Sequence, residues 1–315
     1  MAEICQLSTV NCQLFLTFAP MTAKNNRTLR IEENEREQLM RMVDGKSLIQ
    51  GDLLDVLPTL PDGFAHLIIV DPPYNLPRNF GGNKFTACSP QQYEEYLRSW
   101  FYLLCDKLAP NGTLYMCGDW RCSSSMQRVI EERLTILNRI TWQREKGRGA
   151  AHNWKNSMED IWFAVKNPND YYFNLDAVKQ RRRVLAPYRQ DGEPKDWEQT
   201  TEGRFRTTCP SNFWDDISVP FWSMPENTDH PTQKPEKLLA KLILASSKEG
   251  DMVFDPFLGS GTTAVVAEKL HRQYCGVELN PDYCLLAAKR LLLADTDKSI
   301  QGYADGVFWE RHSGK

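Results

Sequence analysis

Residues 66–75 read His-Leu-Ile-Ile-Val-Asp-Pro-Pro-Tyr-Asn, and residues 252–263 read Met-Val-Phe-Asp-Pro-Phe-Leu-Gly-Ser-Gly-Thr-Thr. Each stretch is a short apolar run that ends in turn residues, which is typical of a buried parallel strand. In open α/β sheets, ligands bind beyond the carboxyl ends of such strands. The two stretches therefore predict one ligand-binding cleft assembled from distant parts of the chain.

The rest of the chain alternates apolar runs with segments of helical periodicity. We expect strands at 47–50, 66–70, 113–117, 135–143, 160–165, 252–255 and 273–278. We expect helices at 31–42, 53–60, 123–133, 262–271 and 281–293, and two more that begin at Pro90 and Pro235. This alternation predicts an α/β fold with a doubly wound, mostly parallel sheet.

The composition is that of an ordinary globular protein. The 315 residues carry a net charge of −3, so any nucleic-acid surface must be local. The nine cysteines form no Cys-x-x-Cys pair and none pairs with histidines at zinc-ligand spacing, so we expect no metal site. No stretch reaches the roughly 18 apolar residues of a membrane span. Together with the irregularly spaced cysteines, this predicts a cytoplasmic protein.

The turn after the strand at 252–255 is similar to a nucleotide-binding turn. It lacks the third glycine of a dinucleotide fingerprint and the Gly-Lys-Ser/Thr of a phosphate loop. Glu278 ends the next expected strand, about 20 residues after Asp255, where dinucleotide folds place a ribose-binding acid. A nucleoside cofactor without a pyrophosphate, such as S-adenosylmethionine, suits both signals. The alternatives are a simple tight turn at the glycines and an ordinary helix cap at Glu278.

The turn after the strand at 66–70 suits a flat base that bears an amine. The Asp71 carboxylate and the Pro72 carbonyl can accept hydrogen bonds from both N–H groups of the amine and turn its lone pair outward. Consecutive prolines stiffen the turn, while Tyr74 can stack on the base and Asn75 can brace the loop. A base inside a duplex must be flipped out to reach such a pocket. The alternative is a strand-terminating turn that the Asp71 carboxylate caps.

These motifs resemble those of the DNA amino-methyltransferases, in the permuted group whose DPPY motif precedes the FxGxG-type motif. The resemblance rests on residues 71–75, 230–235, 255–263 and 276–280, and Leu258 stands where the family often has alanine. It implies the class I S-adenosylmethionine-dependent methyltransferase fold, with a seven-stranded, mostly parallel sheet. It implies catalytic roles for Asp71, Pro72, Pro73, Tyr74 and Asn75. It implies cofactor-binding roles for Asp52, Asp71, Thr232, Lys234, Asp255, Phe257, Gly259, Ser260, Gly261, Thr262, Thr263, Glu278 and Asn280.

Residues 166–226 interrupt the alternation of strands and helices, and we interpret them as a target-recognition insertion. The predicted organisation is an N-terminal extension (1–44), a catalytic half of the core (45–165), the insertion (166–226), a cofactor-binding half (227–295) and a C-terminal tail whose order the sequence leaves open (296–315). A basic, glycine-containing stretch at 139–155 predicts a mobile loop that grips DNA phosphates. The predicted DNA-binding residues are Arg144, Lys146, Arg148, Arg181, Arg182 and Arg183.

The predicted function is methyl transfer from S-adenosylmethionine to adenine N6 within a short sequence of double-stranded DNA. Family members with aspartate in the DPPY motif mostly modify adenine, although cytosine N4 needs the same two acceptors. Open alternatives are cytosine N4, an RNA base, a protein amide, or a catalytically silent DNA-binding regulator. The missing third glycine disfavours a nicotinamide oxidoreductase. Further expected partners are a cognate restriction endonuclease and a second copy of the chain, and DNA binding would associate the protein with the nucleoid.

Overall fold

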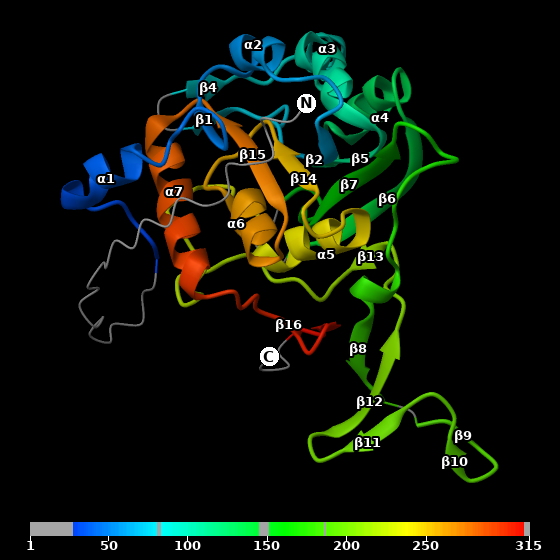
Figure 1. Ribbon diagram of the computed structural model, residues 1–315. Helices are drawn as coiled ribbons and strands as arrows, with labels where there is room; N and C mark the ends of the chain where they lie inside the picture. The colour runs from blue at the N-terminus through cyan, green and yellow to red at the C-terminus, as the bar shows by residue number, and fades with distance from the viewer. Residues whose placement is uncertain (1–27, 81–82, 145–150, 186, 312–315) are drawn as a thin grey trace.

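The computed structural model describes residues 28–80, 83–144, 151–185 and 187–311, and its largest element is a twisted central sheet (Figure 1). The strand order is β1-β15-β14-β2-β5-β7-β6-β13. The β5–β7 and β6–β7 pairs are antiparallel, and the other neighbours in this sheet are parallel. The strands are β1 (Leu48–Gln50), β2 (Ala65–Val70), β5 (Leu108–Gly118), β6 (Thr135–Gln143), β7 (Met158–Val165), β13 (Phe213–Trp214), β14 (Met252–Asp255) and β15 (Gln273–Glu278).

The predicted fold class is confirmed, and the sheet has one strand more than the seven expected. The additional strand is β13, which the predicted insertion contributes to the edge of the sheet beside β6. It was not expected because two residues carry no detectable periodicity.

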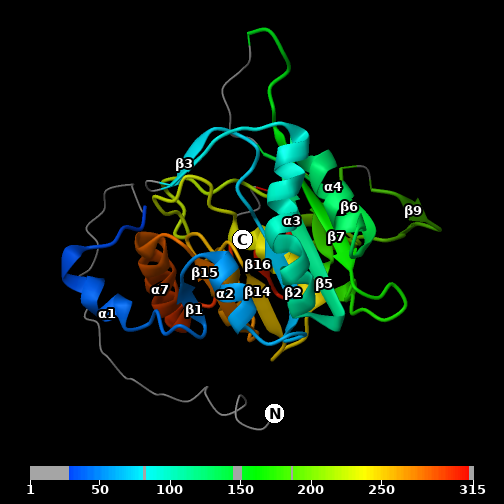
Figure 2. The ribbon, with the colours of Figure 1, turned by 90° about the horizontal axis from the view of Figure 1, so that it is seen from above.

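Helices cover both faces of this sheet. One face carries α2 (Leu53–Val56), α3 (Pro90–Lys107) and α4 (Ser123–Glu131), and the other carries α5 (Glu236–Ser246), α6 (Thr262–Lys269) and α7 (Pro281–Thr296). The short helix α1 (Arg36–Met40) lies beside α7 at the β1 end of the molecule, as Figure 2 shows from above. Strand β2 serves both faces, because Ile68 packs with the first set of helices and Leu67 with the second.

Capping residues decide several helix boundaries. Ser89 Oγ accepts from Gln92 N at 3.3 Å, and Gln92 returns a side-chain bond to Ser89 N, so α3 begins at Pro90 as predicted. Helix α3 ends at Lys107, and β5 begins at once, so the expected strand at 113–117 is longer than predicted. Helices α1 and α2 are shorter than expected, because each shares its segment with a 3₁₀ turn, at Glu33–Glu35 and Leu57–Thr59.

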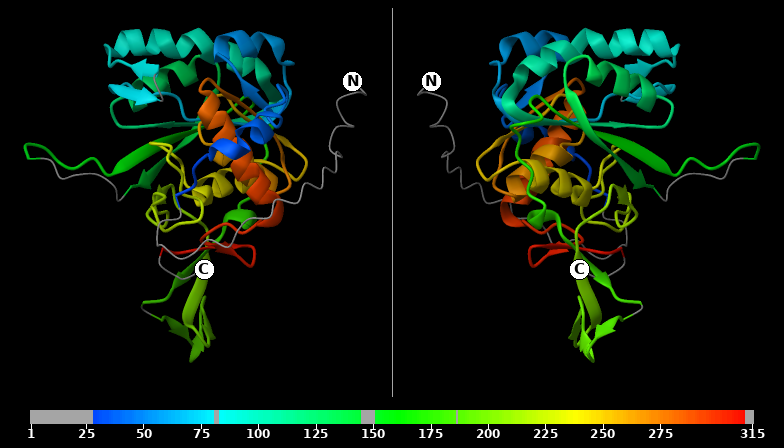
Figure 3. Two further views of the ribbon diagram at one scale, coloured as in Figure 1. Left: turned by 90° about the vertical axis from the view of Figure 1, so that its left-hand side faces the viewer. Right: turned by 90° about the vertical axis from the view of Figure 1, so that its right-hand side faces the viewer.

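A second, smaller sheet combines the predicted insertion with the predicted tail. Its strand order is β11-β12-β8-β17-β16, and it projects from the core together with the β9–β10 hairpin (Figure 3). Its strands are β8 (Gln180–Arg183), β11 (Glu198–Thr200), β12 (Gly203–Thr208), β16 (Tyr303–Ala304) and β17 (Val307–Trp309), and the hairpin is β9 (Arg189–Gln190) with β10 (Glu193–Pro194). The tail, whose order the sequence leaves open, therefore contains the strands β16 and β17, and β17 pairs with β8 of the insertion.

Two further features complete the fold. A hairpin of β3 (Arg78–Phe80) and β4 (Asn83–Phe85) follows the DPPY turn. None of the described helices is both long and apolar enough to span a bilayer. Most of the predicted N-terminal extension, residues 1–27, lies outside the described residues. The domain boundaries themselves stay predictions.

Candidate active site

A cavity of about 800 Å³ opens at the carboxyl ends of the central parallel strands. Tyr74 and Gly259 both line it, so the two distant turns meet in one cleft, as the sequence predicts. Asn75 and Gly261 are not among its lining residues. The predicted catalytic and cofactor residues that line it are Asp52, Asp71, Pro72, Pro73, Tyr74, Thr232, Lys234, Asp255, Phe257, Gly259, Ser260, Thr262, Thr263, Glu278 and Asn280.

The DPPY turn is held rigidly by the segment that starts α3. Asn75 Nδ2 donates to the Cys88 carbonyl at 2.8 Å, and Cys88 N donates to Asn75 Oδ1 at 2.8 Å. The Tyr93 hydroxyl donates to the Pro73 carbonyl at 2.9 Å. Asn75 therefore acts as the brace that the sequence predicts, and Pro73 is used to anchor the turn.

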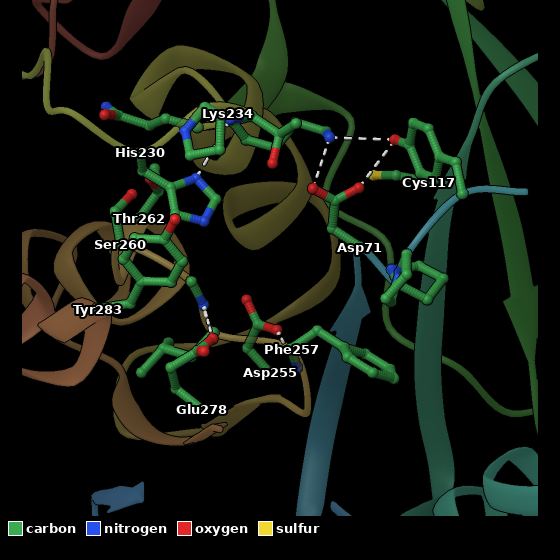
Figure 4. A pocket seen from close by; sticks show the side chains of 18 of the residues that line it. Asp71, Cys117, His230, Lys234, Asp255, Phe257, Ser260, Thr262, Glu278 and Tyr283 are labelled. Atoms are coloured by element: carbon green, nitrogen blue, oxygen red, sulfur yellow. Dashed lines mark hydrogen bonds and ion pairs between the residues drawn. The ribbon is translucent and has the colours of Figure 1, made fainter. Parts of the chain in front are cut away.

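Asp71 belongs to a cluster of four side chains that the sequence did not reveal. Lys234 Nζ lies 2.6 Å from Asp71 Oδ2, and Figure 4 shows the two side chains pointing toward each other. The Tyr74 hydroxyl donates to Asp71 Oδ1 at 2.8 Å. Glu159, at the start of β7, lies 3.3 Å from the same ammonium through its Oε2 atom. The sequence hints at Glu159 through two adjacent acids, Glu159 and Asp160, at the head of a largely apolar strand.

Burial and the neighbouring carboxylates together set the pKa values of Lys234 and Tyr74. Burial disfavours the charged form of Lys234, but the carboxylates of Asp71 and Glu159 outweigh it and raise the pKa of the ammonium. Burial, reinforced by the same two carboxylates, raises the pKa of Tyr74 well above its ordinary value. Lys234 is therefore a cation and Tyr74 a neutral hydroxyl donor throughout the physiological pH range.

The glycine-containing turn is organised by two acids. Glu278, labelled in Figure 4, accepts from Gly259 N and from Asn280 N, both at 2.8 Å. Asn280 also caps α7. Asp255 accepts from Thr263 Oγ1 at 2.5 Å and from Phe257 N at 3.0 Å. The alternative of a tight turn holds in part, because Gly259 and Gly261 adopt positive φ angles of 54° and 81°. The cap of α7 is Asn280 rather than Glu278.

We predict that Asp255 makes the stability of the ligand-free protein depend on pH. Burial raises its pKa from 3.8 to about 7. Below pH 3.8 the carboxyl is protonated in both states. Between pH 3.8 and pH 7 the carboxyl ionises in the unfolded state but stays protonated in the folded state. The free energy of unfolding therefore falls as the pH rises through this range and becomes constant above pH 7.

Asp255→Asn keeps the acceptor for Phe257 N without the charge. It is expected to raise the free energy of unfolding on the order of 2 kcal/mol at pH 8.5 and to change it little near pH 4. Urea denaturation at the two pH values measures the difference. An equal effect at both would contradict the assignment.

A buried arginine supports the turn from behind, and the sequence did not predict it. Arg290 Nη1, on α7, donates to the Ser260 carbonyl at 3.0 Å and to Thr262 Oγ1 at 2.8 Å. Its Nη2 atom lies 3.1 Å from Glu236 of α5. The buried Arg290 guanidinium thus fixes the positions of Ser260 and Thr262, which line the cavity.

Three other lining residues complete the cofactor end of the cavity. Asp52 caps α2 by accepting from Leu54 N at 2.8 Å. Thr232 follows His230, whose ring packs edge-on against Tyr283 at 4.5 Å between ring centroids. Burial lowers the pKa of His230 to about 4, so it is neutral near pH 7. This agrees with a structural rather than an acid–base role for His230.

The acid-rich lining suits S-adenosylmethionine better than a phosphate-bearing cofactor. Six acids line the cavity against three lysine or arginine residues. Carboxylates favour hydroxyl donors and cations and disfavour phosphates. A volume of about 800 Å³ also falls in the range of small-molecule sites. The cofactor-binding roles stay predictions, with Asp52 and Glu278 expected at the nucleoside end and Thr232 and Lys234 near the methionine end.

The predicted DNA-binding arginines have different surroundings. Arg144 lines the cavity and donates to Glu159, so it is engaged within the site. Arg181 pairs with Glu198 at 2.5 Å and stacks against Phe205 and Trp309, so it stabilises the small sheet. Lys146 and Arg148 lie outside the described residues.

Arg182 and Arg183 remain more accessible than Arg181. Arg182 donates to Gln180 Oε1 at 2.9 Å and lies 3.8 Å from Asp215, while Arg183 is exposed on β8. Trp142 is buried and donates to the Ile217 carbonyl at 3.0 Å, which agrees with core packing. DNA contacts by the arginines stay predictions.

Comparisons with known proteins show that this chain is similar to DNA methyltransferases. A model of the DNA methylase family matches residues 65–289. The type II methyltransferase M.HpaI of Haemophilus parainfluenzae is 32% identical over 246 residues, which cover 78% of this chain and 73% of that protein. The DNA adenine methyltransferase YhdJ of Escherichia coli (strain K12) is 33% identical over 261 residues, which cover 80% and 84%.

A solved structure supports the fold. The crystal structure of the M1.HpyAVI–SAM complex has a TM-score of 0.52 at 22% identity, over 77% of this chain and 97% of that chain. Because the family model spans more than half of the sequence and includes both turns of the cavity, this chain belongs to the DNA methylase family.

Proposed function

We propose that this chain is a DNA methyltransferase that transfers a methyl group from S-adenosylmethionine to the N6 amine of adenine. The observation that carries the proposal is that the Asp71–Tyr74 turn and the Gly259–Thr263 turn line one cavity. Membership of the family and the similarity to an adenine methyltransferase support it. An aspartate rather than a serine in the DPPY motif favours adenine over cytosine.

Asp71 and the Pro72 carbonyl act as the acceptors that hold the target amine. Asp71 and Pro72 both line the cavity, and the anchored turn fixes their positions before the base arrives. When bound, S-adenosylmethionine supplies a sulfonium methyl group whose carbon–sulfur bond breaks as the bond to the amine nitrogen forms. The amine becomes positively charged and then loses a proton, and the Asp71 carboxylate stabilises that developing charge. The target base must leave the duplex to reach these acceptors.

We predict that Tyr74 contributes mainly through its ring. Tyr74→Ala removes a stacking surface for the base and is expected to lower kcat/KM about 10- to 100-fold. Tyr74→Phe removes only the hydroxyl that bonds to Asp71 and Glu159, and is expected to lose less than about fivefold. Steady-state methylation of an oligonucleotide compares the two variants. Equal losses would show that the hydroxyl, not the ring, carries the contribution.

A direct assay tests the proposed function. The protein is incubated with double-stranded DNA and labelled S-adenosylmethionine, and the nucleosides are separated by mass spectrometry. The expected product is N6-methyladenine. Formation of N4-methylcytosine would instead show that the target is the N4 amine of cytosine. Label transfer to RNA or protein, or none at all, would overturn it.

Sequence recognition by residues 166–226 is part of this proposal. A cognate restriction endonuclease, a homodimer and a cytoplasmic, nucleoid-associated location stay predictions. Modification-sensitive sequencing of DNA from cells that express the chain would identify the recognition sequence.

A further inference from the structure

Lys234 lies between two carboxylates, one of which is the proposed acceptor for the target amine. Its Nζ atom is 2.6 Å from Asp71 Oδ2 and 3.3 Å from Glu159 Oε2. The exposed fractions of the three side chains are 10% for Lys234, 22% for Asp71 and 4% for Glu159. A buried ammonium needs a carboxylate at all times, because an unpaired charge at this depth is costly.

Both oxygens of Asp71 already have a partner in the arrangement that the structure shows. One oxygen accepts from the Tyr74 hydroxyl at 2.8 Å, and the other pairs with Lys234. An incoming amine must compete with a full positive charge for this carboxylate. A looser contact between the ammonium and Asp71 would leave the carboxylate a stronger acceptor for the amine.

Glu159 is placed to receive that ammonium. Arg144 donates to its Oε1 atom, which leaves Oε2 directed toward Lys234 and the Tyr74 hydroxyl, 3.2 Å away. It lies on β7, in the interior of the central sheet and two strands from β2, so its backbone is fixed. The ammonium can therefore pass from Asp71 to Glu159 without leaving the cluster.

We propose that Glu159 is a positioning residue that takes over the Lys234 ammonium when Asp71 accepts the target amine. The inference rests on the proposed function. Glu159 does not touch the base in this scheme. It acts through Lys234, by making the Asp71 carboxylate available at little electrostatic cost.

Glu159→Gln tests the inference, because glutamine keeps the size and an acceptor oxygen but lacks the charge that attracts Lys234. The single-turnover rate constant for methyl transfer, with both substrates saturating, is expected to fall about 10- to 100-fold. The KM for S-adenosylmethionine is expected to change less than twofold. Glu159→Asp restores the charge and is expected to recover part of the rate.

A matched control separates this role from a structural one. Glu94 is also largely buried and pairs with Arg98 and Arg128, but it does not line the cavity. Glu94→Gln is expected to leave the single-turnover rate unchanged. If Glu159→Gln methylates as fast as the wild type, or if its rate loss is matched by an equal rise in KM for the cofactor, the inference is overturned. If the wild type itself methylates no DNA adenine, the proposed function fails instead.

The folded state of the variant is checked separately by its thermal midpoint. If the Glu159→Gln protein does not fold, the Glu159→Asp variant is used for the test instead. Its shorter carboxylate draws away from Lys234, and we expect a rate between wild type and zero with an unchanged KM for the cofactor. Wild-type rate in that variant would contradict the inference.

Discussion

Asp71→Ala is expected to lower the methyl-transfer rate about 100- to 1000-fold, the largest loss of activity that we predict for a single side chain. The substitution removes one of the two acceptors for the target amine and the carboxylate that stabilises positive charge on its nitrogen. Rapid-quench measurement of a single turnover, with both substrates saturating, isolates this effect from substrate binding.

Cofactor binding and folding provide the controls for Asp71→Ala. Lys234 keeps Glu159 as a partner at 3.3 Å, so the substitution does not leave a buried ammonium without a carboxylate. Calorimetric titration with S-adenosylmethionine is expected to give an affinity close to that of the wild type. A variant that retains full activity would refute the acceptor role of Asp71. A variant that binds no cofactor would show that Asp71 contributes to cofactor binding rather than to holding the target base.

Gly261→Ala is expected to be the most destabilising of the substitutions considered. Gly261 has a φ of +81°, and a Cβ atom there would lie 2.5 Å from the Ala287 Cβ atom on α7. The left-handed backbone costs about 1–2 kcal/mol for a residue other than glycine. The clash with a packed helix adds about 1–3 kcal/mol. We therefore expect a loss of about 2–5 kcal/mol in the free energy of unfolding, together with weaker cofactor binding.

Gly250→Ala is the matched control for this prediction. Gly250 has the same φ of +81°, but nothing lies within 4 Å of the position of its Cβ atom. Gly250→Ala is therefore expected to lower the free energy of unfolding only by the cost of the left-handed backbone. The difference between the two variants in urea denaturation measures the helix packing at Gly261, and an absence of any difference would contradict it.

Local signals in the sequence were enough for the elements that form the cofactor half. β14 and β15 have the predicted boundaries, 252–255 and 273–278. Asn280 caps α7 by accepting from Asp282 N at 2.9 Å, and α7 begins at Pro281, the predicted first residue of that helix. Apolar runs, capping residues and turn glycines act within a few residues of one another, so they can be recognised without knowledge of the fold.

The short β13, β16 and β17 strands could not be predicted in this way. Each has only two or three residues. They are strands because a neighbouring strand supplies hydrogen-bond partners, and for β17 that neighbour is β8, more than a hundred residues earlier in the chain. Arg181 illustrates the consequence, since a residue expected to contact DNA stacks against Trp309 of the former tail.

The sequence by itself determined the family, the α/β fold and the two turns that build the cleft, because these depend on short motifs and on periodicity. The tertiary structure alone decided which charges meet inside that cleft. Lys234 reaches Asp71 across 163 positions of sequence, and Glu159 reaches Lys234 from β7. Such pairings depend on strand order and on the desolvation of charges at the sheet edge, and neither quantity is encoded in local spacing.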